Sequence, residues 1–398
     1  MDEALLERYA DLIVRFGANV QPGQEVRLLS SVGKQELTRA IATRLYQVGA
    51  VFVSVRYGDS HIDRARLECA VDEALGYEPD WIVQMIRDHG TGHGATIGLS
   101  GNPWPGLLEG VDPERIARDR VPGRNELLEN QVNSRNNWTL APGPTEGWAR
   151  VVYPDLEPGD ALARLWEQVV HMCRLDEDDP VAAWERRIDE LNRVKAALNA
   201  LHLDALHFAG PGTDLTIGLL PGSRWNGGFL TTETGIVHHP NLPTEEVFTV
   251  PDPERTQGVV QGSRPRELEG SIIRDFTLRF ESGRLTGVEA AAGGEALEAW
   301  SRRDDGAARL GEVALVDSSG RVGPLDTVFY DTLIDENAAS HIAIGLGFDW
   351  AVEEADRPRV NRSEVHIDLM IGRPEMTVTG ITVDGGQIPL LVGGHWQV

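Results

Sequence analysis

Apolar residues recur at helical and strand-like spacings through the first half of this chain. Residues 5–16 carry an apolar residue every three to four positions, and residues 34–48 repeat that pattern before Gly49, so both segments are predicted to be amphipathic helices. Residues 25–29 and 51–57 are short runs rich in apolar or β-branched side chains, which favour strands. A strand, a helix and a strand at this spacing predict a βαβ unit and a largely parallel sheet.

Two long helical patterns follow, at residues 159–174 and 180–201. The acidic segment between them ends at Pro180, which suits the first turn of a helix, with Asp179 as its cap. We therefore predict a division of the chain at this point. An N-terminal α/β domain would span residues 1–179, and a C-terminal, metal-binding catalytic domain would span residues 180–398.

The second half of the chain is rich in glycine and in strand patterns. Helical patterns are confined to residues 294–304 and 335–344. We expect strands at residues 205–208, 215–219, 246–249, 272–280, 287–290, 312–316, 365–370 and 377–383. Many strands and few helices predict an α+β domain with mostly antiparallel pairing.

The composition excludes several classes of partner. The formal net charge is −25, and Lys34 and Lys195 are the only lysines among 37 basic residues. Such acidity argues against binding to nucleic acid or to anionic membrane surfaces. The two cysteines, Cys69 and Cys173, are too few for a disulfide framework, and no apolar run approaches the roughly 20 residues that span a bilayer. The N-terminus lacks the basic start of a signal peptide, so we expect a cytoplasmic protein.

Candidate chemistry begins with His366 and Asp368, which lie two residues apart in an alternating run. In a strand both point to one face, roughly 6–7 Å apart, where they can bind one cation together. A hydrogen bond between them on a solvated strand explains the same spacing. Glu312 precedes the apolar run 313–316. A carboxylate at the end of a buried strand needs water, an ion pair or a metal.

Further candidates lie in two other segments. His341 falls on the predicted helix 335–344 and is either a core histidine or a ligand. Glu336 in the first turn either stabilises the positive end of that helix or moves protons. Glu245 and Glu246 are adjacent in a strand, so they point to opposite faces and only one can enter a site. We expect Glu246 to do so, with Glu245 as an outer proton-transfer group or a surface charge.

Four segments in order resemble one family. They are Pro-Thr-Glu-Glu-Val-Phe-Thr-x-Pro-Asp at residues 243–252, Leu-Gly-Glu-Val-Ala-Leu-Val at 310–316, Asp-Glu-Asn-Ala-Ala-Ser-His at 335–341 and Asn-Arg-Ser-x-x-His-x-Asp at 361–368. Together they are similar to the M29 family of metallo-aminopeptidases, and the similarity runs nearly from end to end. The resemblance implies a hydrolase with two divalent metal ions (Zn, Co, Mn or Mg). It would remove N-terminal amino acids from peptides by attack of a metal-bound water.

The resemblance also implies a ligand set: Glu246, Glu312, His341, His366 and Asp368. Within that set Glu312 would bridge the two ions. Outside the set, Glu336 or Glu245 would move protons. The substrate would be a peptide or a small aminoacyl compound, and the protein would be a homodimer. One position departs from the family, which usually has a tyrosine seven residues after the histidine at 341. Phe348 stands there and lacks a hydroxyl donor, whose loss can lower the rate by about 10²–10³-fold.

A second interpretation uses fewer ligands. His341, His366 and Asp368 alone form a set of two histidines and one carboxylate, which is typical of mononuclear Fe(II) oxygenases. Ring-cleaving dioxygenases of dihydroxypyridines that resemble this family would be the corresponding enzymes. Glu246 and Glu312 argue against this interpretation, because such an iron site needs open positions. A binding protein without activity is a third interpretation, which the change at Phe348 leaves open.

Overall fold

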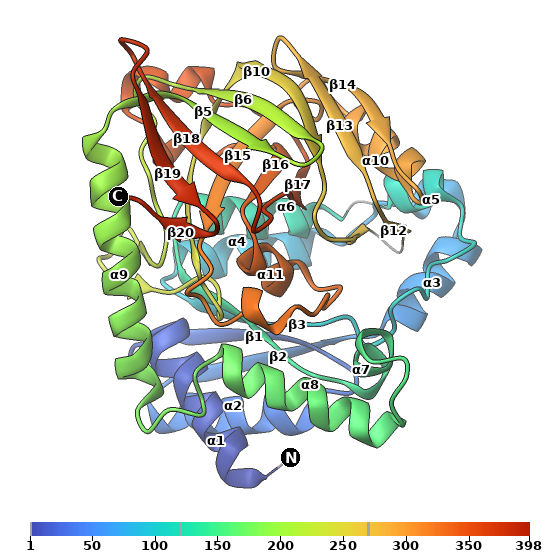
Figure 1. Ribbon diagram of the computed structural model, residues 1–398. Coiled ribbons are helices and arrows are strands. Elements are labelled where there is room, and N and C mark those ends of the chain that lie inside the picture. Colours follow the sequence, from blue (N-terminus) through green and yellow to red (C-terminus); the bar gives the residue numbers. More distant parts are fainter. Residues whose placement is uncertain (1, 120, 269–270) are drawn as a thin grey trace. The chain divides into compact units, whose positions relative to one another are not determined.

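The computed structural model describes residues 2–119, 121–268 and 271–398 (Figure 1). The chain forms two compact units. The first comprises Met1–Glu185 and Phe229–Pro243, and the second comprises Arg186–Gly228 and Thr244–Val398. The units therefore divide inside α9 (Pro180–Ala200) rather than before it, and residues 229–243 return to the first unit. A division into continuous domains after residue 179 remains a prediction.

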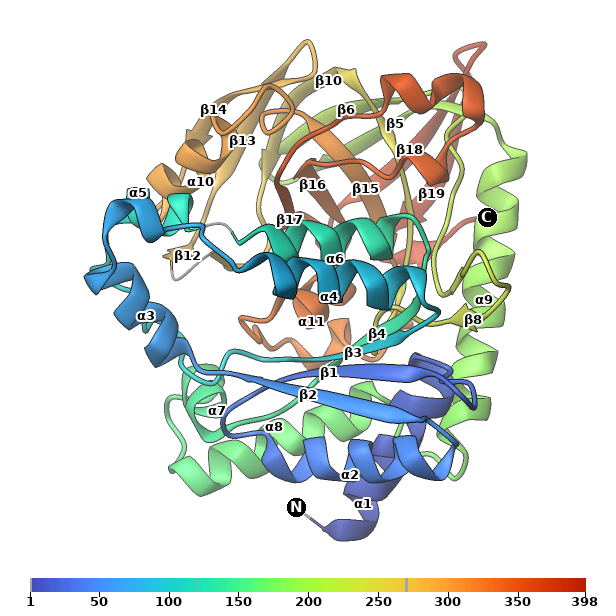
Figure 2. The same ribbon diagram turned by 180° about the vertical axis from the view of Figure 1, so that it is seen from behind.

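The first unit is built on a parallel sheet with the strand order β2-β1-β3-β4. Its strands are β1 (Glu25–Ser31), β2 (Phe52–Gly58), β3 (Ala95–Ser100) and β4 (Asn137–Pro142). Its helices are α1 (Glu3–Asp11), α2 (Gln35–Gln47), α3 (Ser60–Cys69), α4 (Asp80–Thr91), α5 (Pro113–Arg118), α6 (Pro122–Val132), α7 (Glu146–Val152) and α8 (Pro158–Met172). Figures 1 and 2 show α1, α2 and α8 on one face of the sheet and α4 and α6 on the other. The predicted parallel sheet with helices is thus confirmed.

The segment after β4 is helical. Residues 146–152 form α7, because the Thr145 hydroxyl accepts a hydrogen bond from the backbone nitrogen of Trp148 at 3.4 Å and caps the helix. The short ribbon of β7 (Leu230–Thr231) and β8 (Val237–His238) also belongs to this unit.

The second unit is mostly antiparallel, as predicted. Its larger sheet has the order β14-β13-β10-β6-β5-β18-β19-β20. These strands are β5 (Leu203–Gly210), β6 (Thr213–Leu219), β10 (Pro251–Gln261), β13 (Thr277–Glu281), β14 (Arg284–Glu289), β18 (Thr377–Thr382), β19 (Gln387–Val392) and β20 (His395–Trp396). A smaller sheet has the order β17-β16-β15-β9 and consists of β9 (Glu246–Thr249), β15 (Leu310–Val316), β16 (His341–Gly345) and β17 (His366–Met370). The pair β11 (Arg266–Leu268) and β12 (Ser271–Ile273) and the helices α10 (Gly294–Ser301) and α11 (Thr332–Asp335) complete the unit.

The predicted helix at residues 335–344 is wrong. The helix α11 ends at Asp335, a 3₁₀ turn follows at Glu336–Ala338, and His341–Gly345 forms the strand β16. Ile342 and Ile344 are β-branched and alternate with smaller side chains, and β16 pairs with β15 on one side and β17 on the other. Pairing on both edges outweighs the local helical pattern. The predicted strand 272–280 is two strands, β12 and β13, separated at Asp275, whose φ is +48°.

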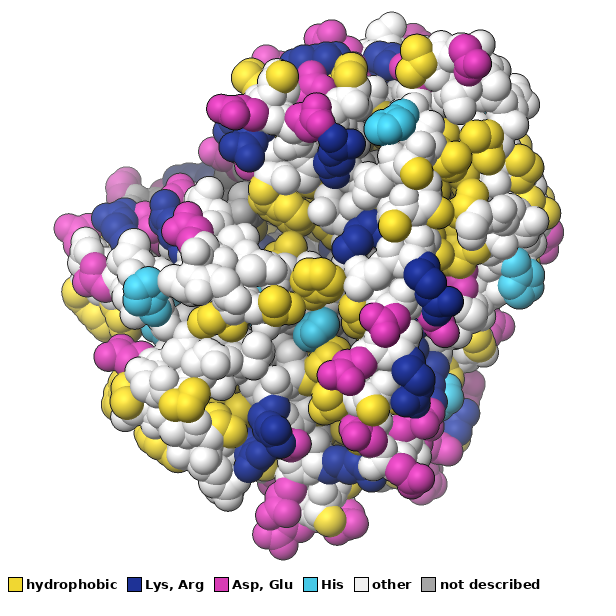
Figure 3. Space-filling view, turned by 90° about the vertical axis from the view of Figure 1, so that its left-hand side faces the viewer, with side chains coloured by type: hydrophobic (Ala, Val, Ile, Leu, Met, Phe, Trp, Pro, Cys, Tyr) yellow, Lys and Arg dark blue, Asp and Glu magenta, His cyan; other side chains and the backbone are white. Residues whose placement is uncertain are grey.

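Charged side chains are mixed at the surface. Figure 3 shows acidic and basic side chains interspersed over the face that it presents. Several arginines pair with acidic neighbours, as Arg44 does with Asp11 at 2.6 Å. Among the helices of the described residues, none combines the length and the apolar character that crossing a membrane requires.

Candidate metal centre

The smaller sheet of the second unit brings the five predicted ligands to one face. Ala314 on β15 lies opposite Phe248 on β9 and His341 on β16, while Ala343 on β16 lies opposite Glu312 on β15 and Asp368 on β17. Because side chains alternate along each strand, this register determines which residues share a face. The predicted ligands that share it are Glu246, Glu312, His341, His366 and Asp368.

Small side chains form the floor of this face. Ala314 and Ala343 lie among the ligand positions and are fully buried. On the opposite face Val313, Ile342 and Leu369 are also fully buried, so the apolar side of the sheet faces the core. The alternation thus anchors the sheet through one face, while the two alanines leave space for longer polar side chains on the other.

Glu312 lies between the two histidines. Its Oε1 is 3.6 Å from His341 Nε2, and its Oε2 is 3.6 Å from His366 Nε2. His341 Nε2 also lies 3.2 Å from Glu246 Oε2, and His366 Nε2 lies 3.2 Å from Asp368 Oδ1. Ligand atoms of Glu246, Glu312 and His341 all fall within 4.8 Å of one another. One carboxylate oxygen of Glu312 therefore faces His341 and Glu246, and the other faces His366 and Asp368.

Backbone carbonyls orient both histidine rings. His366 Nδ1 is 2.8 Å from the carbonyl oxygen of Leu346, and His341 Nδ1 is 3.3 Å from that of Ala339. These contacts direct each Nε2 toward the carboxylates, which is the usual arrangement of histidines that bind metals. A bulge in β15 lies beside the first contact, because the pairing with β16 shifts between Leu310 and Glu312. At Gly311 a side chain would collide with the carbonyl oxygens of Gly345 and Leu346.

Protonation in the cluster reflects burial and the neighbouring charges. Burial lowers the pKa of His366, but Asp368 and Glu312 outweigh it and raise that pKa to about 9. Burial likewise disfavours a charged His341, yet its contacts with Glu312, Glu246 and Asp368 raise its pKa well above the usual value. Burial raises the pKa of Glu246 to about 8, and the positive charge of His341 only partly opposes that. Burial alone would also raise the pKa of Asp368, but His366 holds that pKa well below its usual range.

The donor set fits a divalent metal. Glu246 Oε2 is buried and accepts no hydrogen bond from the residues that the structure describes, although His341 Nε2 is near. An unpaired carboxylate oxygen in a buried site is costly, and a cation would satisfy it. Carboxylates and imidazoles together suit zinc, cobalt or manganese.

Glu336 lies at the margin of the cluster. It is half-buried on the 3₁₀ turn that precedes β16. Burial, followed by the negative charges of Asp368 and Glu246, raises its pKa well above the usual value. Glu336 therefore interacts electrostatically with the predicted ligands, and its backbone comes from a turn rather than from the predicted helix.

Glu245 lies in a different environment. Its side chain is fully buried, its Oε2 accepts a hydrogen bond from Arg187 Nε at 2.6 Å, and Arg187 Nη2 donates to Asp317 at 2.7 Å. We call Arg187, Glu245 and Asp317 the arginine cluster. The backbone nitrogen of Glu245 donates to Asn337 Oδ1 at 2.6 Å, which ties the start of β9 to the turn that carries Glu336. No local signal in the sequence indicates the roles of Arg187 or Asp317, because the three residues are far apart along the chain.

Aromatic rings adjoin the ligand face. The ring of Phe348 lies 5.3 Å from that of His366, measured between centroids, and stacks on Trp350 at 5.6 Å. Phe248 lies 6.0 Å from each of the other two aromatic rings. We call Phe248, Phe348 and Trp350 the aromatic wall.

Comparisons with known proteins found a matching family and relatives that cover nearly the whole chain. The family described as thermophilic metalloprotease (M29) matches residues 2–396. Aminopeptidase T of Thermus thermophilus is 42% identical over 403 residues, covering 99% of this chain and 98% of that protein. Aminopeptidase AmpS of Bacillus subtilis is 35% identical, covering 98% of each. The solved structure of wild-type AmpT from Thermus thermophilus superposes with a TM-score of 0.92 at 41% identity, covering 100% of both chains.

Proposed function

Because the chain belongs to the M29 family of metalloproteases, we propose that it is a metallo-aminopeptidase that removes N-terminal amino acids from peptides. The observation that carries this proposal is the position of Glu312, with one carboxylate oxygen toward each histidine. Its relatives, named as aminopeptidases, cover nearly the whole chain.

Two divalent cations suit the ligand face better than one. Glu246, Glu312 and His341 would hold one ion, and Glu312, His366 and Asp368 would hold the other, with Glu312 shared. When bound, such ions polarise a carbonyl group and lower the pKa of water.

Glu336 is the better candidate for proton transfer. It is half-buried, whereas Glu245 is fully buried and bound to Arg187. In this mechanism Glu336 takes a proton from the attacking water and returns it to the departing amine. Glu245 instead fixes the start of β9, and therefore the backbone of Glu246. Phe348 has no hydroxyl, so the mechanism assigns no hydrogen bond to that side chain.

The arrangement gives less support to an iron oxygenase. A site of two histidines and one carboxylate leaves positions open for oxygen and substrate. Glu246 and Glu312 would occupy those positions, since both lie within 4 Å of His341 Nε2. A homodimeric assembly and a cytoplasmic location also remain proposals, and light scattering of the purified protein tests the first of them.

Metal analysis joined to a substrate screen tests the function. The protein is loaded separately with Zn²⁺, Co²⁺, Mn²⁺ or Mg²⁺, its bound metal is counted, and hydrolysis of aminoacyl amides and short peptides is measured. We expect about two ions per chain and release of the first residue only. The variant Glu312→Gln should lower kcat by at least about 10³-fold, as expected for removing a group that acts in the transition state. Uptake of oxygen with a dihydroxypyridine, without peptide cleavage, would contradict the proposal.

A further inference from the structure

We propose that the aromatic wall receives the side chain of the substrate's N-terminal residue and selects large apolar residues there. This inference rests on the proposed aminopeptidase function. It concerns Phe248, Phe348 and Trp350, to which neither the ligand set nor the proton transfer assigns a role.

The wall lies within reach of the first residue of a bound peptide. Phe248 is two positions after Glu246 on β9, so it shares the face of the ligands. Phe348 lies beside His366, with 5.3 Å between ring centroids. A peptide whose first carbonyl is held between His341 and His366 therefore has its first side chain next to these rings.

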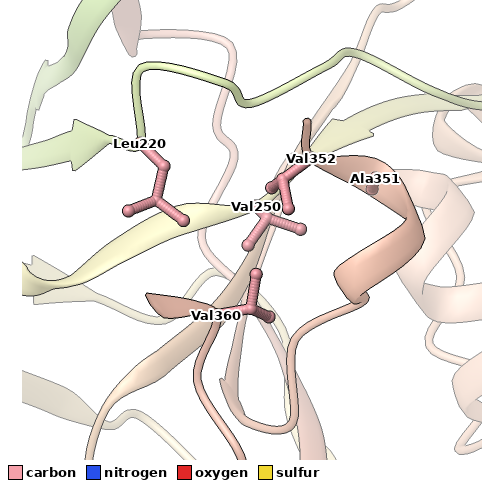
Figure 4. Packing of buried hydrophobic residues seen from close by; sticks show 5 residues of the cluster. All are labelled: Leu220, Val250, Ala351, Val352 and Val360. Atoms are coloured by element: carbon pink, nitrogen blue, oxygen red, sulfur yellow. The ribbon is translucent and has the colours of Figure 1, made fainter. Parts of the chain in front are cut away.

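Two of the three rings pack against a buried hydrophobic cluster. The cluster consists of Leu220, Val250, Ala351, Val352 and Val360 (Figure 4). Phe348 and Trp350 pack against it. All three aromatic side chains nevertheless remain only half-buried. The exposed part of each ring can be buried by contact with another group, and burial of apolar surface is favourable.

The charges next to the wall are already paired. Glu353 binds Arg224, and Asp349 lies 3.8 Å from Arg362. The wall itself consists of carbon surface and one indole. A charged N-terminal side chain would lose its favourable hydration there without gaining an ion pair, whereas leucine, methionine or phenylalanine is stabilised by leaving water. The surface therefore fits an apolar residue larger than alanine.

Substrate pairs that differ in one residue test this inference. With the metal-loaded protein, we expect kcat/KM for Leu-Gly-Gly and Phe-Gly-Gly to exceed that for Ala-Gly-Gly by about 10- to 100-fold, and Lys-Gly-Gly and Glu-Gly-Gly to be poor substrates. The peptides Gly-Leu-Gly and Gly-Ala-Gly serve as controls, because they move the variable side chain to the second position. Preference that follows the second residue, or a preference for charged first residues, would overturn the proposal.

The variant Trp350→Ala should reduce the preference for leucine over alanine by about tenfold, while Trp350→Phe should retain most of it. Trp81→Ala is the matched control, because Trp81 on α4 is 67% exposed and belongs to the other unit. Circular dichroism and metal content show whether each variant is folded and loaded. An unchanged preference in folded, loaded Trp350→Ala would contradict the assignment.

Binding separates this inference from the proposed function. Calorimetric titration of the metal-loaded protein with the hydroxamates of phenylalanine, leucine and alanine needs no turnover. We expect the two larger hydroxamates to bind at least tenfold more tightly, and Trp350→Ala to weaken only those two. Absence of peptide cleavage with this order of binding would count against the function alone. Equal binding of the three hydroxamates would overturn the role of the wall.

Discussion

Glu245 and Glu246 are neighbours in the chain, yet they belong to two buried charge clusters of opposite character. Glu245 meets the guanidinium of Arg187, which also binds Asp317, so in the arginine cluster one cation is shared by two carboxylates. Glu246 meets His341 and the carboxylate of Glu312, and its Oε2 accepts no hydrogen bond from the described residues. At the start of β9, two adjacent residues thus lie in different environments: Glu245 contacts Arg187, and Glu246, the first residue of the strand, lies among the predicted metal ligands.

The pKa directions express the same difference. In the arginine cluster, burial raises the pKa of Asp317, but Arg187 outweighs it and lowers that pKa. In the cluster of predicted ligands, burial and the charge of Glu312 raise the pKa of Glu246 to about 8, although the charge of His341 opposes them. Asp317 is therefore stabilised as a charged carboxylate beside Arg187, whereas Glu246 and His366 hold protons that a bound cation would have to displace.

The largest expected effect separates the two glutamates. We expect Glu246→Gln to lower kcat/KM by at least about 10³-fold, because it removes a predicted ligand. In metal-free protein at pH 7, however, Glu246→Gln should unfold at nearly the same urea concentration as wild type, because the raised pKa of Glu246 leaves its side chain neutral there and glutamine is a neutral group of similar size. Glu245→Gln should unfold at a lower urea concentration, because Arg187 loses a partner. Equal losses of stability in the two variants would contradict the comparison.

The next effect concerns Arg187. We expect Arg187→Met to lower the free energy of unfolding by about 3–5 kcal/mol, because Glu245 and Asp317 stay buried without their cation. Arg44→Met is the control, because it breaks the more exposed pair with Asp11 and should cost about 1 kcal/mol or less. Urea denaturation of the metal-free proteins measures both. A similar small loss in both variants would show that the arginine cluster contributes little.

A bound metal ion should stabilise the protein through the predicted ligands and not through the arginine cluster. At a free concentration 100 times its dissociation constant, a bound ion stabilises the folded state by about 2.7 kcal/mol. We expect this increase in wild-type protein and in any Arg187→Met protein that remains folded, but a much smaller one in Glu312→Gln. Thermal unfolding at increasing Zn²⁺ or Co²⁺ concentration measures it. Metal stabilisation that Glu312→Gln retains in full would place the ions elsewhere.

The smallest effect is a dependence of metal binding on pH. The pKa of His366 is about 9 and that of Glu246 about 8, both raised, so these groups hold protons at pH 7 in the absence of metal. Metal must displace those protons, so its apparent affinity should rise as pH increases toward 9 and level off above it. Calorimetry at pH 7 in buffers with different ionisation enthalpies should register protons released to the buffer. A metal affinity that falls as the pH rises from 7 to 9 would contradict this prediction.

Sequence patterns predicted which residues gather on the ligand face, but they did not predict the strand β16 or the contacts of Arg187. His366 and Asp368 are two residues apart in a strand, which correctly predicted that they share a face. The alternation of side chains also predicted that Glu246, and not Glu245, lies on that face. The strand β16 was missed, because a short segment beside a helical pattern becomes a strand only through partners on both edges. Arg187 was missed because its partners are 58 and 130 residues away, and one arginine on a long helix is indistinguishable from a solvated one.

The bulge at Gly311 links a residue without a side chain to the chemistry of the site. The carbonyl oxygen that orients His366 belongs to Leu346, and a methyl group at residue 311 would strike that same oxygen. Gly311→Ala would therefore turn the imidazole away from its carboxylates without altering any ligand. In a library of random variants, we expect substitutions at Gly311 to inactivate the protein as often as substitutions at Glu312, although the glycine carries no functional group.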